Sequence, residues 1–164
     1  MAQVDMFMKI VGTSQGKIRG ESTDAKHAGE IEIDSFSWDV IQPYDKATGL
    51  GSGKRQHGLF KFVMKTQTAT PLLLTACCSG EHLKEAVLTC RKAGKDQQEY
   101  MKWTLKDALI THIETGYDAN DADDIVPSDE VSLAFNYIEV QYQQQKPDGT
   151  LGGAVVFVDD LGGQ

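Results

Sequence analysis

The sequence predicts a mainly β protein, a barrel or a sandwich with one short α-helix. Most of the chain alternates apolar and polar residues with the period of two that is typical of half-buried strands. Only one segment, TATPLLLTACCSGE (68–81), has the spacing and the end signals of a helix. Repeated strands with a single helix favour an all-β barrel or sandwich. The composition does not change along the 164 residues, so we expect a single domain over 1–164.

Three segments in the first half of the chain are predicted strands. They are DMFMKIV (5–11), EIEIDSFSWDVI (30–41) and GLFKFVMKT (58–66). In the second segment the apolar positions change phase near Asp34–Ser35, which indicates a β-bulge, where one extra residue redirects the faces. After this change Phe36, Trp38 and Val40 share one face, and we expect that face to point into the core.

The predicted helix follows the third strand and has a signal at each end. Thr70 is the expected N-cap, Pro71 the first helical residue and Gly80 the stop. Four residues fall on one side at helical spacing: Leu72, Leu73, Ala76 and Cys77. We expect this side of the helix to cover one end of the barrel or one edge of the sheet.

Four further strands are predicted after the helix. They are HLKEAVLTCRKA (82–93), QEYMKWTLKDALITHIET (98–115), EVSLAFNYIEVQYQQQ (130–145) and LGGAVVFVDD (151–160). In the third of these, one apolar phase ends at Phe135 and another begins at Ile138. The last strand follows KPDGT (146–150), which has the residue order of a tight turn. The segments 43–57, rich in Gly, and 116–129, rich in Asp, are predicted to be exposed loops.

The charge balance and the N-terminus limit the partners that we expect. Lys and Arg number 16 against 24 Asp and Glu, which gives a net charge of −8. This charge opposes binding to nucleic acids, whose phosphates attract cationic side chains, and binding to anionic membranes. No apolar run approaches the ~20 residues of a membrane helix, and Asp5 and Lys9 interrupt the N-terminal apolar stretch. We therefore expect no nucleic-acid partner, no membrane insertion, synthesis in the cytoplasm, and no cleavable signal peptide.

No motif for a cofactor or a metal fits its pattern. TGLGSGKRQ (48–56) lacks the first Gly and the final Ser or Thr of a phosphate-binding loop. GYDANDADD (116–124) lacks residues that a calcium-binding EF-hand needs at its later positions. Cys77, Cys78 and Cys90 have neither metal-site nor disulfide spacing, and we interpret them as small buried hydrophobic residues in a reducing compartment. We expect no cofactor and no metal.

The most suggestive cluster for catalysis lies in GESTDAKHAG (20–29). His27 follows Glu21 and Asp24, and Ser22 would be the nucleophile of an acid–base mechanism. However, no nucleophile elbow and no oxyanion motif surround Ser22. We therefore interpret the segment as a polar turn that hydrogen-bonds its own backbone, and we predict that the protein is not an enzyme and has no catalytic residue.

Several motifs resemble those of one known family, in the order in which they occur. They are DMFMKI, GES-x-D-x-K-H-x-GEIEI, SFSW, TPLLLTACCSG, RKAGKDQQEYMKWTLKDALIT and VSLAFNYIEVQYQQQKPDGT. Together they cover essentially the whole chain. They resemble the haemolysin-coregulated protein (Hcp) family, the tube proteins of the bacterial type VI secretion system.

The resemblance implies a fold, an assembly and a set of partners. The fold would be a β-barrel of two sheets with one flanking helix. The chain would form homohexameric rings that stack into a tube, with the sheath and spike proteins of the apparatus as partners and effector proteins as cargo. The tube would be secreted from the bacterial cytoplasm without a cleavable signal peptide. The alternative is a small-ligand-binding or enzymatic β-barrel of another family, for which we would expect a monomer or dimer.

Three polar residues are the candidates for contact with cargo. Ser35, Ser37 and Asp39 alternate with the apolar residues of 36–40 and should therefore point away from the core. If this strand forms part of the inner surface of the ring, as the resemblance implies, these side chains line the channel. Small side chains leave room there, and hydroxyl groups can hydrogen-bond to a cargo protein. The alternative is that this face meets solvent or a neighbouring subunit.

Overall fold

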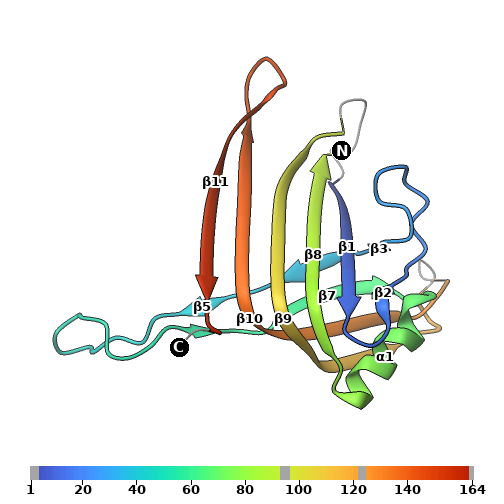
Figure 1. Cartoon of the computed structure of the whole chain (residues 1–164), viewed down its shortest axis with the longest axis horizontal. Helices are drawn as coiled ribbons and strands as arrows, with labels where there is room; N and C mark the ends of the chain where they lie inside the picture. The colour runs from blue at the N-terminus through green and yellow to red at the C-terminus, as the bar shows by residue number, and fades with distance from the viewer. Residues whose placement is uncertain (1–3, 93–96, 122–124, 163–164) are drawn as a thin grey trace.

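The computed structural model describes residues 4–92, 97–121 and 125–162 (Figure 1). The strands before the helix are β1 (Val4–Gly12), β2 (Gly16–Ile18), β3 (Ile31–Glu32), β4 (Ser35–Ser37), β5 (Val40–Ile41), β6 (Gln56–His57) and β7 (Phe60–Lys65). Helix α1 (Ala69–Ser79) is followed by β8 (His82–Lys92), β9 (Glu99–Gly116), β10 (Ser128–Gln145) and β11 (Leu151–Asp160). The predicted mainly β class with one short helix is confirmed.

The strands form two antiparallel sheets. The main sheet has nine strands in the order β2-β1-β8-β9-β10-β7-β4, with β11 paired to β10 and β3 paired to β1. The second sheet consists of β5 and β6. In Figure 1 this small sheet lies at the base of a long extension, residues 40–57, that projects from the body of the molecule. The predicted exposed loop 43–57 is partly a paired ribbon, since it contains β6 and the bridge between Tyr44 and Gly51.

The main sheet is not closed into a barrel. The strand order ends with β2 on one side and β4 on the other. The two strands nearest in sequence at these ends are β3, which pairs with β1 beside β2, and β4, which pairs with β7. These strands are consecutive, and the residues between them hydrogen-bond to both sides: the Ile33 amide donates to the Met6 carbonyl (3.0 Å) and the Asp34 amide donates to the Val63 carbonyl (2.7 Å). The predicted change of phase at Asp34–Ser35 thus marks the passage of the chain from β1 to β7.

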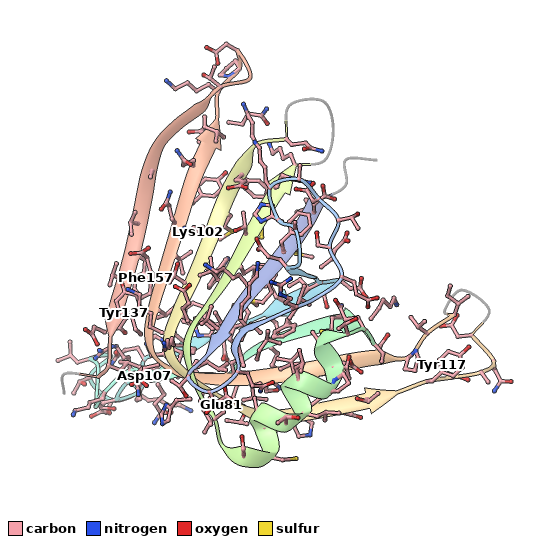
Figure 2. The ribbon with its side chains drawn as sticks, turned by 45° about the vertical axis from the view of Figure 1, so that its right-hand side comes forward. Glu81, Lys102, Asp107, Tyr117, Tyr137 and Phe157 are labelled. Carbon is pink, nitrogen blue, oxygen red and sulfur yellow. The ribbon has the colours of Figure 1, made fainter. Side chains whose placement is uncertain are left out.

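The main sheet bends sharply along one line. Lys84, Asp107 and Asn136 lie opposite one another in β8, β9 and β10, and the ladders omit them. Asp107 has a φ of 51°, in the left-handed region that residues other than glycine rarely adopt. On either side of this line the buried positions of β9 change phase, from Leu105 to Ala108. The long strands β9 and β10 therefore contribute to two walls that face each other (Figures 1 and 2).

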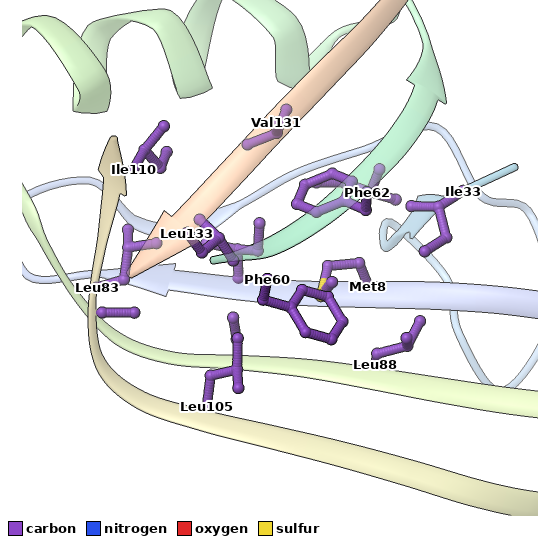
Figure 3. Packing of buried hydrophobic residues seen from close by; sticks show 14 of the residues in the cluster. Met8, Ile33, Phe60, Phe62, Leu83, Leu88, Leu105, Ile110, Val131 and Leu133 are labelled. Carbon is purple, nitrogen blue, oxygen red and sulfur yellow. The ribbon is translucent and has the colours of Figure 1, made fainter. Parts of the chain in front are cut away.

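The hydrophobic core fills the space between these two walls (Figure 3). Its largest fully buried side chains come from both halves of the sheet: Phe60, Phe62 and Met64 of β7, Met8 and Ile10 of β1, Leu88 of β8, Leu105 of β9 and Leu133 of β10. β7 pairs with the first part of β10, from Ser128 to Leu133, while β1 and β8 lie in the opposite wall. The core between the two walls therefore depends on the bend. One sheet thus supplies both sides of its own interior.

Helix α1 begins two residues earlier than the sequence suggested. Its N-cap is Thr68, which makes no side-chain capping hydrogen bond, and the buried Thr70 hydroxyl donates instead to Asp129 Oδ2 (2.6 Å). Gly80 ends the helix with a φ of 66°, as predicted, since glycine adopts this left-handed conformation without strain. The helix packs against β9 and β2. The fully buried residues on its predicted apolar side are Leu73 and Ala76, while Leu72 and Cys77 are partly buried.

A buried arginine fastens the segment 20–30 to the sheet. The Arg91 side chain is 3% exposed; it donates two hydrogen bonds to Asp24 (3.0 and 2.7 Å) and one to Asp5 (3.2 Å). Its guanidinium also lies over the Phe7 ring, 4.8 Å from the centroid. The hydrogen bond from Arg91 holds the pKa of Asp24 well below its usual value, against the opposing effect of burial. Removing either carboxylate would leave a buried cation poorly compensated.

We predict that Phe62→Ala lowers the free energy of unfolding by about 3–5 kcal/mol, because truncating a fully buried Phe removes transfer energy and leaves a cavity. The neighbouring outward residue provides the control: Lys61→Ala should change stability by no more than about 0.5 kcal/mol. Urea unfolding followed by circular dichroism measures both variants. Equal losses in the two variants would contradict the assignment of Phe62 to the core.

We predict that Asp24→Asn lowers the melting temperature by several degrees at pH 7 and by much less near pH 2. The lowered pKa means that the ionised Asp24 stabilises the fold above its unfolded-state value of 3.8, and that this contribution is lost as the pH falls further. Thermal denaturation across this pH range is the measurement. Asp34→Asn is the control, since the Asp34–Lys65 pair is about half exposed and contributes little. A gap that stays constant with pH would contradict the prediction.

Candidate functional site

The three candidate residues for cargo contact lie on the outer side of β4 and of the segment that follows it. Ser35 and Ser37 are exposed and alternate with Phe36 and Trp38, which are partly buried and pack against the core. Asp39 is exposed as well. The predicted alternation is therefore present from Ser35 to Asp39.

Val40 departs from this prediction. It continues the phase of Phe36 and Trp38, yet it is 44% exposed. The chain leaves the main sheet after Trp38, and β5 pairs instead with β6 in the small sheet (Val40 with His57, Ile41 with Gln56). Because the core does not extend beneath this ribbon, the prediction that Val40 faces the core is wrong.

The outward side chains of four neighbouring strand segments form one surface, here called the polar face. Residues directly opposite in an antiparallel ladder point to the same side of the sheet. By the register of β4, β7, β10 and β9, the polar face comprises Ser35, Ser37, Lys61, Val63, Lys65, His112, Glu114, Ser128 and Glu130, whereas Ser132, in the same register, is buried. This set contains hydroxyl groups and charges of both signs, with no Phe, Tyr or Trp. Such a surface can hydrogen-bond to a protein while remaining compatible with water.

A hollow of about 450 Å³ opens on the polar face. It is lined by Ser37, Trp38, Asp39, Leu59 and Lys61. The structure therefore brings two of the three candidate residues, Ser37 and Asp39, together, whereas Ser35 lies outside this lining. The hollow offers a hydroxyl, a carboxylate and an ammonium group above an apolar wall, and it has no nucleophile beside a histidine. These groups suit recognition of a polar protein surface.

The cluster weighed as a catalytic site is a structural anchor. His27 is 7% exposed; its Nδ1 lies 3.0 Å from Glu30 Oε2 and its Nε2 lies 2.7 Å from Glu99 Oε1. The Ser22 hydroxyl accepts a hydrogen bond from the Asp24 amide (3.3 Å) and does not contact the imidazole. The Gly29 amide donates to the Ser22 carbonyl (2.8 Å), which confirms the interpretation as a turn that bonds its own backbone.

The cysteines differ in their surroundings. Cys90 is buried, and burial raises the pKa of its thiol to about 11, which makes it unreactive. Cys77 is partly buried and Cys78 is exposed, so the interpretation as buried hydrophobic residues holds for Cys90 alone. Within residues 4–92, 97–121 and 125–162, no cluster of three or more His, Cys, Asp or Glu side chains could bind a metal ion. No helix in the same ranges is long and apolar enough to span a membrane.

Strand β11 presents an unusual apolar edge. Its residues Val155, Val156, Phe157 and Val158 are between 45% and 72% exposed. Successive side chains point to opposite sides of a strand, so both sides of β11 carry exposed apolar groups. In the part of the chain that the structure describes, β11 pairs with β10 alone, and its other edge is open. Figure 2 shows Phe157 on this strand, far from helix α1.

One side of β11 continues the apolar surface of the core. Phe157 lies opposite Val140, which lies opposite Trp103 in β9. Val155 lies opposite Tyr142 on the same side. This row leads outward from the buried Trp103 to the exposed Phe157. Because apolar rows of this kind are normally covered, the surface indicates a contact with another protein.

The extension is attached to β11 through one carboxylate. Asp159 accepts hydrogen bonds from Arg55 Nε (2.5 Å) and Nη2 (2.7 Å), and its Oδ2 lies 2.7 Å from His57 Nε2. The Arg55 guanidinium, and to a lesser degree His57, hold the pKa of Asp159 down to about 2, although burial acts in the opposite direction. We call this group the Asp159 clamp.

Sequence analysis missed both the apolar edge and the clamp. The run AVVFV (154–158) was visible and identified a strand, but a consecutive apolar run does not reveal that it lies at a sheet edge. Arg55 and Asp159 are separated by 104 positions, and no local pattern connects them.

Comparisons with known proteins agree on one family. Residues 7–142 match the family model described as "Type VI secretion system effector, Hcp". The chain is 38% identical over 156 residues to "Protein hcp1" of Pseudomonas aeruginosa, covering 93% of this chain and 91% of that protein. It is also 30% identical over 118 residues to the "Major exported protein" of the same species, covering 65% of this chain and 69% of that protein.

Solved structures lead to the same family. The crystal structure of Hcp1 from Salmonella typhimurium superposes with a TM-score of 0.76 at 30% identity, over 98% of this chain and 96% of that chain. The family consists of structural, secreted tube proteins, and the predicted absence of enzymatic activity agrees with this. The family match covers most of the chain, and the matches to Protein hcp1 and to the Salmonella Hcp1 structure span 93% and 98% of it. This protein therefore belongs to the Hcp family of type VI secretion proteins.

Proposed function

We propose that this chain is the inner-tube subunit of a type VI secretion apparatus. Homohexameric rings of it would stack into a tube, carry effector proteins in the central channel and leave the bacterial cytoplasm without a cleavable signal peptide. Sheath and spike proteins of the apparatus would be its further partners. The observation that carries the proposal is the uncovered apolar surface of β11, since an isolated subunit has no use for it.

The position of this surface favours a ring over a two-fold dimer. β11 and the extension lie at one side of the molecule, and α1, β1 and β2 lie at the other (Figure 1). Two neighbouring subunits in a ring meet through different surfaces, so the apolar side of one would contact the other side of the next. A stable contact of this kind buries about 1,000 Å² or more, and the exposed row from Val140 to Phe157 would form its apolar centre.

The polar face would then line the channel. It is the outer side of β4, of β7, and of residues 112–116 of β9 and 128–132 of β10, which pair beside them. It carries Ser35 and Ser37. Hydroxyl groups can exchange water for hydrogen bonds to a cargo protein at little net cost. The hollow between Ser37, Asp39 and Lys61 would give a protruding polar side chain of the cargo a place to enter.

We predict that Phe157→Ser weakens each subunit contact by about threefold to tenfold and leaves the monomer folded. Burying a fully exposed Phe side chain is worth about 1.5–3 kcal/mol, Phe157 is 45% exposed before docking, and 1.4 kcal/mol corresponds to a factor of ten. Light scattering and negative-stain electron microscopy over a concentration series measure assembly. Phe157→Leu is the control, since leucine keeps a large apolar side chain at the same position of β11 and should retain most of the contact. If Phe157→Ser assembles like the unaltered chain, β11 is not part of the contact.

We predict that Ser37→Gln and Ser37→Trp leave rings intact and reduce the effector protein that the rings retain and export, because larger side chains fill the hollow. The measurement is the amount of effector that copurifies with rings and reaches the medium of a secreting strain. Ser37→Ala is the control, because it removes the same hydroxyl without adding size. Unchanged retention and export by intact rings would remove Ser37 from the cargo surface, and loss of rings would instead place β4 in the subunit contact.

A further inference from the structure

The extension cannot hold its own position. It is a two-stranded ribbon in which β5 and β6 contribute two residues each, followed by the isolated bridge between Tyr44 and Gly51. A lone two-stranded ribbon is at best marginally stable in water. Several of its apolar side chains, including Val40, Ile41 and Leu50, are exposed, so it has no core of its own. Its orientation must be set where it joins the main sheet.

The Asp159 clamp is the polar part of that junction. The Arg55 guanidinium binds both carboxylate oxygens of Asp159 through two parallel hydrogen bonds, a geometry that fixes direction as well as distance. The His57 and Asp159 side chains are 6% and 12% exposed, so the group is largely shielded from water. Each bond in it is therefore stronger than its equivalent at an exposed surface.

Aromatic rings form the apolar part of the junction. The His57 ring stacks on Trp38 with 5.5 Å between centroids and meets the edge of Phe135 at 5.6 Å. Trp38 in turn contacts Trp103 of the core at 5.6 Å. His57 thus connects β6 both to the core and, through Asp159, to the end of β11.

Asp159 occupies a position that would otherwise continue the apolar row. It lies opposite Ile138 on the same side of β11 as Phe157 and Val155. A carboxylate at this position would be unfavourable if the surface were covered by apolar groups without a paired cation. Arg55 and His57 supply that pairing, and they belong to the extension. The acidic residue therefore has a specific role: it attaches the extension beside the apolar strand.

We propose that the Asp159 clamp holds the extension against the end of β11, so that the apolar side chains of both form one continuous surface on which a second copy of this chain docks. This inference rests on the proposed function, because the second copy is the next subunit of the ring. The clamp is a positioning device: in its absence the ring contacts of His57 remain as the attachment, the motion of the extension increases, and docking has to restrict that motion at a cost in affinity.

The test compares Asp159→Asn with Asp160→Asn. The two variants change the same charge by the same amount in neighbouring residues, and Asp160 accepts a hydrogen bond from the Gly162 amide rather than from the extension. Trypsin cleavage after Lys46 and Lys54 reports the mobility of the extension in the monomer. Sedimentation over a concentration series reports ring assembly, and circular dichroism reports the fold. Arg55→Gln breaks the clamp from the other side, at a partly exposed residue whose loss leaves the core intact.

We expect Asp159→Asn and Arg55→Gln each to speed cleavage after Lys46 about tenfold or more and to raise the concentration needed for assembly by a similar factor, since charge-assisted hydrogen bonds are lost. Asp160→Asn should behave like the unaltered chain. The double variant Arg55→Gln/Asp159→Asn should resemble either single variant, because both changes remove one interaction.

Two results would overturn the proposal. Cleavage and assembly of Asp159→Asn that match those of Asp160→Asn would show that the clamp does not hold the extension. Faster cleavage with unchanged assembly would show that docking does not use the extension. If the unaltered chain remains monomeric under every condition, the ring proposal fails by itself, and the cleavage rates of the monomer still decide whether Asp159 orders residues 40–57.

Discussion

The sharp bend of the main sheet at Asp107 is the constraint on which the other features depend. A flat sheet of these strands would leave its apolar side in water, whereas the bend lets one sheet form both walls around its core. The φ of 51° at Asp107 carries a cost of order 1–3 kcal/mol. The Asn136 side chain, which donates to the Asp107 carboxylate (2.9 Å), and His82, whose Nδ1 lies 3.2 Å from it, support this conformation.

The bend also separates the two surfaces to which we assign roles. On one side of the bend, the second part of β10 and β11 extend farther than the core, so the apolar side of β11 is exposed. In the other direction, the last part of β9 and the first part of β10 lie in one sheet with β7 and β4. The polar face of this part of the sheet points away from the core. A subunit built this way can contact a neighbour with one surface and a solvent-filled channel with the other, without the same residues serving both.

The sequence predicted the features that depend on local pattern. The alternation of Phe36 and Trp38 with serines and the glycine stop of α1 were predicted because strand period and helix capping act over a few residues. A barrel was predicted, but the main sheet stays open, and neither the exposed position of Val40 nor the clamp was predicted, since all three depend on which strands pair. Apolar character indicates that Val40 will be covered, but it cannot distinguish a core from a contact between subunits.

An open strand edge is also a hazard to the unassembled subunit. Unpaired backbone groups beside an apolar strand are a template on which unrelated extended chains can add, which begins aggregation. Within the described residues, β11 pairs with no strand other than β10, so its second edge carries no strand partner. The chain opposes such addition by repulsion, through its net charge of −8 and through Asp160 at the end of the strand. The solubility of the free subunit therefore depends on charge, and high salt or low pH would weaken that protection even while the fold remains intact.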